Sequence, residues 1–131
     1  MHVIAVEYPG YGVYTSPEGA TAEKIESDAE SVYKFLTNVC QWKENDIVVC
    51  GRSIGSGPAC FLASRFKPAA LALVSPHTSI RGVVKDFFMG GIAQYIVAER
   101  FKNLEAIEQV KCPAFILHGQ RDETVNFSHS Q

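Results

Sequence analysis

The sequence has no long hydrophobic run, no paired cysteines and no excess of charge of either sign. Its first apolar run, at residues 3–6, has no cationic leader and ends at Glu7, so we expect neither a signal peptide nor a membrane span there. The net charge is -2, which leaves no basic surface for nucleic acid. No repeat, low-complexity tract or linker divides the chain, so we expect one domain over residues 1–131.

The four cysteines stand singly and lack the C-x-x-C spacing of zinc and redox sites. Reduced, mostly buried thiols are expected, as in a cytoplasmic protein. We expect no metal and no cofactor. The apolar fraction of 47% is sufficient for a packed core, which excludes a disordered or fibrous protein.

Short apolar runs alternate with stretches of helical spacing, which predicts an α/β fold with a mainly parallel sheet and flanking helices. The run at 47–50 is continuous, as in strands that are buried on both faces. The expected strands are 3–8, 47–50, 70–74 and 113–117. The expected helices are 21–36, capped by Thr21, and 54–66, with two or three helical pieces within 79–110.

Gly51-Arg52-Ser53-Ile54-Gly55 stands directly between an expected strand and an expected helix. A G-x-S-x-G pattern in this context predicts a nucleophile elbow, in which a tight turn lifts the serine hydroxyl clear of the sheet. The amide of Ile54 can then donate to an oxyanion. The alternative is a phosphate-binding turn, but the required lysine is missing, since none follows before Lys67.

The acid of such a site is expected downstream, after a buried strand. Asp122 follows the run that ends at Leu117; Glu123 is its nearest rival, and an ordinary loop position is the alternative. Strands of an α/β sheet gather functional groups at their carboxyl ends. Beside Ser53, Ile54 and Asp122, the candidate pocket residues there are Tyr8, Arg52, His77 and His118.

No histidine of the sequence is well placed as the base. His2 precedes the turn, His118 adjoins the acid loop, and His77 follows the strand after the turn. His129 lies downstream of Asp122, and extended chain at about 3.3 Å per residue allows the reach. It stands at the entry to an expected helix, however, with no element to position it. We therefore expect an incomplete triad.

Four motifs in consistent order carry a family resemblance over nearly the whole chain. The sequence resembles the eukaryotic α/β-hydrolase domain proteins that include membrane-associated protein depalmitoylases. The motifs are Val6-Glu7-Tyr8-Pro9-Gly10-Tyr11-Gly12, Ile47-Val48-Val49-Cys50-Gly51-Arg52-Ser53-Ile54-Gly55, Val74-Ser75-Pro76-His77-Thr78-Ser79, and Leu117-His118-Gly119-Gln120-Arg121-Asp122-Glu123-Thr124-Val125 with Phe127-Ser128-His129.

The resemblance implies a partial α/β-hydrolase fold that lacks the first strands and the last strand, with Ser53 as nucleophile and Asp122 as acid. It also implies that the catalytic histidine, in a Gly-His turn, and the loop with the second oxyanion donor lie outside the sequence. Glu7 and His77 depart from the family pattern, which usually has Asp and an apolar residue there, and the Cys-rich lipidated N-terminus of the depalmitoylases has no counterpart.

Two functions remain open. The first is a serine hydrolase of acyl esters or thioesters, inactive as this fragment, whose substrate is an acylated protein or a small acyl ester. Such a protein would be cytoplasmic, with peripheral association at the cytoplasmic face of membranes in the family. The second is a non-catalytic binding protein. A cap or lid is expected at 79–102, whose apolar residues line an acyl groove or pack on the sheet: Val84, Phe87, Phe88, Met89, Ile92 and Tyr95.

Overall fold

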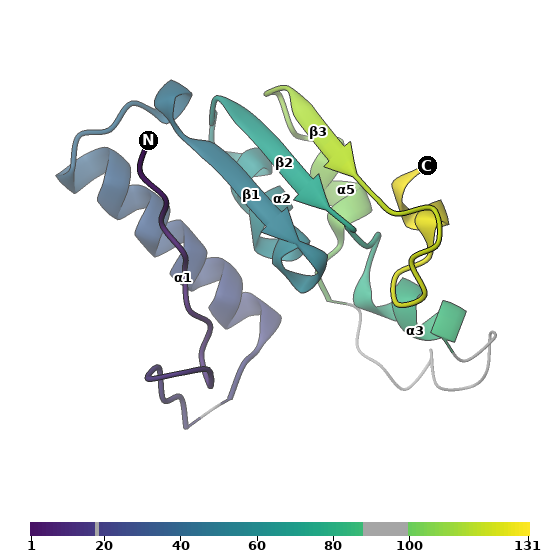
Figure 1. The fold of residues 1–131 in the computed structure, drawn as a ribbon. Helices are drawn as coiled ribbons and strands as arrows, with labels where there is room; N and C mark the ends of the chain where they lie inside the picture. Colours follow the sequence, from purple (N-terminus) through teal and green to yellow (C-terminus); the bar gives the residue numbers. More distant parts are fainter. Residues whose placement is uncertain (18, 88–99) are drawn as a thin grey trace.

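A parallel sheet with helices on one side forms the centre of the molecule (Figure 1). The computed structural model describes residues 1–17, 19–87 and 100–131. The strands are β1 (Val48–Arg52), β2 (Ala70–Val74) and β3 (Ala114–Leu117), and the α-helices are α1 (Ala22–Lys34), α2 (Ser56–Arg65), α3 (Ile80–Phe87) and α5 (Asn103–Ile107). Single turns of other helix types cover Phe35–Val39, Glu44–Asp46, Ser53–Gly55 and Phe127–Ser130.

All strand pairs within the sheet are parallel, in the order β1-β2-β3. Arg52 pairs with Val74, and Val74 pairs with Leu117, so the three strands end at the same level. The segments that follow the strands therefore meet at one edge. The expected parallel sheet and flanking helices are confirmed.

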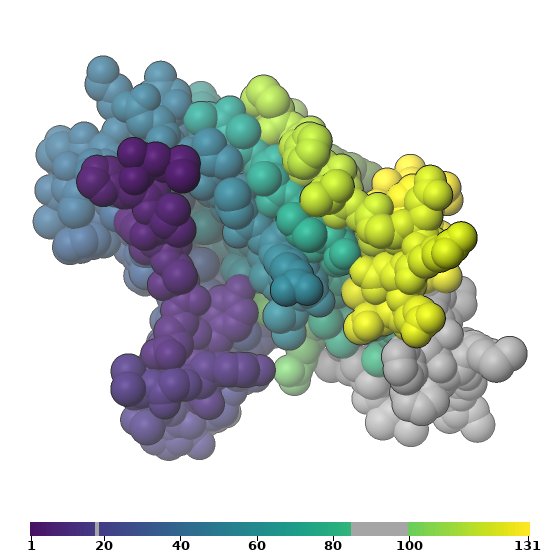
Figure 2. Space-filling model, viewed as in Figure 1, coloured from purple at the N-terminus to yellow at the C-terminus, as the bar shows by residue number. Residues whose placement is uncertain are grey.

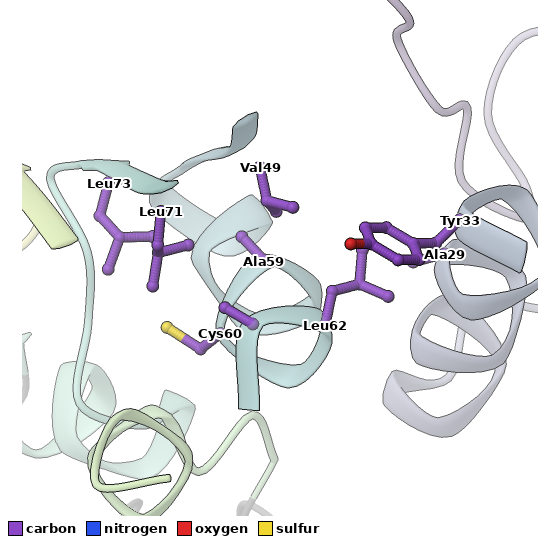
Figure 3. Close-up of a cluster of buried hydrophobic side chains, with 9 residues drawn as sticks. Ala29, Tyr33, Val49, Ala59, Cys60, Leu62, Leu71 and Leu73 are labelled. Atoms are coloured by element: carbon purple, nitrogen blue, oxygen red, sulfur yellow. The ribbon is translucent and has the colours of Figure 1, made fainter. Parts of the chain in front are cut away.

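The core lies between the sheet and α2 (Figure 3). Leu71 and Leu73 of β2 are 0% and 2% exposed and face the small residues of α2, which allow the helix to approach the sheet closely. On the far side of α2, Tyr33 of α1 packs against this helix and stacks on Phe66, with ring centroids 4.6 Å apart. One contiguous core therefore joins the sheet, α2 and α1.

Helix α1 begins as its sequence predicts. Thr21 has an extended backbone, and its side chain accepts a hydrogen bond from the amide of Lys24 at 3.1 Å. This cap satisfies one of the amides that the first helical turn leaves without a partner. Ile25, Ala29 and Tyr33 recur at helical spacing and are buried, so the polar residues of α1 remain on its outer side.

The expected strand at 3–8 is not formed. These residues are extended and mostly exposed, and they run past α1 without pairing with β1, which pairs with β2 alone among the described strands (Figure 1). A cavity of about 470 Å³ separates Ile4, Ala5 and Val6 from β1. A strand exists only when its backbone groups pair with a neighbour, and across this gap they do not.

The expectation that β1 is buried on both faces is wrong for the described part of the chain. Val48, Cys50 and Arg52 are exposed while Val49 and Gly51 are buried, and every residue of β3 is exposed. In Figure 2 the side chains of the sheet reach the surface, on the side away from α2 and α5. The continuous apolar run was interpreted correctly as a parallel strand, but no described helix covers its second face.

The range 79–102, where a cap or lid is expected, contains α3 near its start. At its end, Phe101 is buried and Lys102 is exposed. Its centre, residues 88–99, lies outside the described residues, as do Phe88, Met89, Ile92 and Tyr95.

We predict that the uncovered face causes the chain to self-associate. Phe115 and Leu117 are 64% and 56% exposed on β3, which is also an unpaired edge. Phe115→Lys should shift the sedimentation profile toward monomer, because a charge interrupts the apolar surface. Val39→Lys is the matched control, since Val39 is 66% exposed but lies outside the sheet. A wild-type chain that is monomeric at every concentration tested would contradict the prediction.

Candidate functional site

Ser53 lies in a sharp turn between β1 and α2. Its φ is 50°, in the left-handed region that a side chain disfavours. A Cβ on Gly51 would lie 2.4 Å from the carbonyl oxygen of Gly55 and 2.7 Å from the Cβ of Ala59, so only glycine fits at 51. At Gly55 a Cβ would meet only the Tyr8 hydroxyl, at 3.3 Å. Of the two glycines of the motif, Gly51 is therefore the one at which the tight turn leaves no space for a side chain.

The residues around the turn face an open cavity of about 470 Å³. Tyr8 and Arg52, both candidate pocket residues, line it together with Ile54, whose side chain is 47% exposed. Tyr8 is half-buried, and this burial raises the pKa of its phenol. The rest of the lining is largely apolar and includes Ile4, Val6, Pro58 and Leu62.

Asp122 lies in the loop after β3, at the same edge of the sheet as Ser53. Its Oδ1 accepts hydrogen bonds from the amides of Val125 and Thr124, each at 2.9 Å. These backbone bonds, and a bond from the Ser75 side chain, lower the pKa of the carboxyl. Asp122 is therefore a carboxylate over the physiological pH range. No described contact joins it directly to Ser53.

His118 holds the loop of Asp122. Its side chain is 1% exposed, its Nε2 lies 2.9 Å from the carbonyl oxygen of Val125 and 3.6 Å from Oδ2 of Asp122, and its Nδ1 contacts Ser130. It therefore fixes the shape of the loop and does not face the cavity beside Ser53.

His129 is engaged elsewhere. Its Nδ1 lies 2.8 Å from Oγ1 of Thr78 and 3.2 Å from the Thr78 amide. The residue thus ties the last helical turn to the segment after β2. His2, in the N-terminal segment, lies against the ring of Trp42 with centroids 5.7 Å apart.

His77 is buried behind the turn. It is 3% exposed, and its Nδ1 lies 2.8 Å from Oγ of Ser56, which itself donates to the carbonyl of Ser53 at 2.6 Å. Asn103 of α5 donates to the His77 carbonyl oxygen at 2.8 Å and to Ser56 at 2.9 Å. Sequence reasoning missed Ser56 and Asn103, since neither residue belongs to the G-x-S-x-G pattern and only the folded chain brings them together.

The described residues contain no group of three or more histidine, cysteine or acidic side chains that could hold a metal ion. In the same residues no helix is long and apolar enough to cross a membrane.

Comparison with known proteins identifies the fold. An α/β hydrolase from Vibrio vulnificus superposes with a TM-score of 0.63 over 76% of this chain and 40% of its own, at 18% identity. The chain therefore has part of an α/β-hydrolase fold. No family model matches the sequence.

Proteins that are similar in sequence identify the family more closely than the structural comparison does. The α/β-hydrolase domain-containing protein aho-3 of Caenorhabditis elegans is 34% identical over 98% of this chain, and the human protein 17B is 30% identical over 98%. Protein 17C of Xenopus tropicalis is 32% identical over the same share. The chain belongs to the α/β-hydrolase domain-containing proteins. It spans 37% to 42% of the length of these relatives.

We predict that Gly51→Ala strongly destabilises the fold. The added Cβ would overlap the backbone at Gly55, which cannot move without displacing α2, and overpacking of this kind costs about 1–3 kcal/mol or more. Gly119→Ala is the control, since a Cβ there meets nothing within 4 Å and the change should stay within about 0.5 kcal/mol. Urea unfolding measures both, and equal stability of the two variants would contradict the prediction.

A second prediction concerns pH. Burial, with a smaller effect of His129, lowers the pKa of His77 from 6.5 to about 4. The unfolded chain therefore binds a proton at His77 below pH 6.5 that the folded chain refuses, and stability falls as the pH drops from 6.5 toward 4. From pH 7 to pH 5 the loss from this group should be about 2 kcal/mol.

Urea unfolding at the two pH values measures this loss, and His77→Leu should remove most of it. His2→Leu is the control, because His2 is exposed and should leave the pH dependence unchanged. Equal pH dependence in wild type and His77→Leu would show that His77 titrates alike in both states.

Proposed function

We propose that Ser53 is the nucleophile of a serine hydrolase that cleaves acyl esters or thioesters in the longer protein of which this chain represents a part. The observation that carries the proposal is the left-handed backbone of Ser53 between β1 and α2, with Gly51 pressed against the start of the helix. This is the geometry that a nucleophile elbow requires, in the strand-to-helix context that the G-x-S-x-G pattern predicts.

The proposed reaction is acyl transfer in two steps. The hydroxyl oxygen of Ser53 attacks the carbonyl carbon and passes its proton to a base, and the alcohol or thiol leaves with a proton as the acyl-enzyme forms. Water then gives a proton to the base and attacks the acyl carbon, the bond to Oγ of Ser53 breaks, the carboxylic acid leaves, and the base returns the proton to the serine oxygen. The amide of Ile54 is the proposed donor to the oxyanion, and Asp122 is the proposed acid that orients the base.

The proposed substrate is an acylated protein or a small acyl ester, with protein depalmitoylation as the specific activity. The side chain of Ile54, which adjoins Ser53 and is 47% exposed, supports an apolar acyl chain as the bound group. Such chains are attached to proteins at the cytoplasmic face of membranes, which is the proposed location. The resemblance to depalmitoylases is the other support.

Residues 1–131 alone should be nearly inert. The histidines at 77, 118 and 129 bond to Ser56, to the Asp122 loop and to Thr78, and His2 lies against Trp42. A serine without a base loses most of its activation, because the members of a triad act as a unit. The second candidate function is a non-catalytic hydrolase-like protein that binds an acyl group or a partner through the same crevice.

A fluorophosphonate probe tests the proposal. We expect residues 1–131 to be labelled at a small fraction of the rate of the longer protein, encoded with its flanking sequence. In the longer protein, Ser53→Ala should abolish labelling and Asp122→Asn should reduce it by a factor on the order of 10⁴, as for a triad acid. Ser27→Ala, on the exposed side of α1, is the control.

Two results would contradict the proposal. Labelling of the longer protein that survives Ser53→Ala would assign the nucleophile elsewhere. A longer protein that is not labelled but binds fatty acid at the cavity would favour the binding protein. Rapid labelling of residues 1–131 that is lost in Ser53→Ala would instead contradict the inactivity of this chain alone.

A further inference from the structure

Three buried polar side chains lie together directly behind the turn of Ser53. Ser56, His77 and Asn103 are 0%, 3% and 6% exposed, and they are the buried polar residues of the described part of the chain. They come from the start of α2, the segment after β2 and the start of α5. Buried polar groups lower stability unless they bond to one another, so such a cluster within an apolar core needs a physical reason.

The hydrogen bonds of the cluster assign its protons. Asn103 uses its two amide hydrogens for the His77 carbonyl oxygen and Oγ of Ser56, at 2.8 and 2.9 Å. Ser56 uses its single hydrogen for the Ser53 carbonyl oxygen, at 2.6 Å. The bond of 2.8 Å between Ser56 and Nδ1 of His77 therefore needs a hydrogen from the imidazole. His77 is the Nδ1–H tautomer, and Nδ1 cannot accept from Asn103 at 3.2 Å.

The remaining ring nitrogen has no hydrogen-bond partner among residues 1–17, 19–87 and 100–131. Nε2 of His77 is buried and unbonded, and the residue lines a cavity of about 70 Å³. This volume exceeds the 10–15 Å³ that one water needs. The tautomer thus directs the donor toward Ser56.

We propose that His77 is a positioning residue, which through Ser56 holds the carbonyl of Ser53 and so maintains the left-handed backbone of that residue. A strained φ of 50° persists only when the surroundings fix it, and the Ser56 hydroxyl contacts the Ser53 carbonyl itself. His77 and Asn103 orient that hydroxyl from two other elements. A role of this geometry in catalysis depends on the function proposed above. The effect of His77 on the backbone of the turn does not depend on it.

Two substitutions of similar size separate positioning from packing. His77→Asn places an amide donor near the position of Nδ1 and preserves the bond to Ser56. His77→Gln carries its amide farther, near the position of Nε2, and loses that bond. We expect amide hydrogen exchange at residues 53–57 to accelerate about five- to tenfold in His77→Gln, as for one lost buried hydrogen bond, and to stay near wild type in His77→Asn.

The exchange of β2 and α1 is the internal reference. Equal acceleration across β1, β2 and α2, or equal behaviour of the two variants, would show that His77 acts only through packing and would overturn the proposal. Nitrogen-15 chemical shifts of the wild-type imidazole give a test that needs no folded variant. Protonation at Nε2 in place of Nδ1 would also overturn the proposal.

Probe labelling of the longer protein distinguishes this inference from the proposed function. Slower labelling in His77→Gln, with His77→Asn near wild type, supports both. Local acceleration of exchange in a longer protein that is never labelled supports the positioning role and contradicts the hydrolase. Labelling at Ser53 in all variants, without local change in exchange, supports the hydrolase and overturns the positioning role.

Discussion

The close contact between the end of β1 and the start of α2 is the constraint on which the arrangement of the site depends. Gly51 has no space for a side chain, because the carbonyl of Gly55 and the Cβ of Ala59 occupy the position that its Cβ would take. The chain must therefore reverse within Ser53 and Ile54. The same contact seats α2 on the sheet, where its small residues meet Leu71 and Leu73. The packing that forms the turn is therefore the same packing that forms the core.

A second close contact extends this constraint to α5. A Cβ on Gly57 would overlap the ring of Phe101, which is buried with a φ of 51°. Phe101 lies two residues before Asn103, so its position against α2 delivers the Asn103 side chain to Ser56. A segment distant in sequence therefore reaches the back of the turn because Gly57 of α2 leaves space for Phe101. A side chain at position 57 would displace Phe101 and so separate Asn103 from the groups that it bonds at less than 3 Å.

Much of the fold could be predicted because its elements have local signals. The runs at 70–74 and 113–117 match β2 and β3 within one residue, and Thr21 caps α1 as expected. The segment 3–8 has the composition of a strand, but pairing depends on a neighbour, which composition cannot supply. The burial of β1 was overestimated for the same reason, since a second covering layer is a property of the whole domain.

The candidate site also has parts that the sequence predicts and parts that it does not. Ser53 and Gly51 could be located because a tight turn has a short sequence pattern, and the structure places Ser53 and Asp122 at one edge of the sheet. The Ser56–His77–Asn103 cluster could not, because its members lie 21 to 47 positions apart and have no common motif. His77 was expected to line the pocket. It is buried because Ser56 and Asn103 provide hydrogen-bond partners for it inside the fold.

Asp122 and His77 have opposite environments, and this limits how a base can serve Ser53 in the proposed hydrolase. Backbone amides keep Asp122 charged, whereas burial lowers the pKa of His77 to about 4. A general base works best when its pKa lies near the operating pH, and His77 fails this requirement as well as facing Ser56. In the proposed mechanism a base for Ser53 therefore approaches from the exposed side of the turn, toward the loop of Asp122. There the carboxylate can stabilise an imidazolium, and the buried cluster on the opposite side is left to hold the turn.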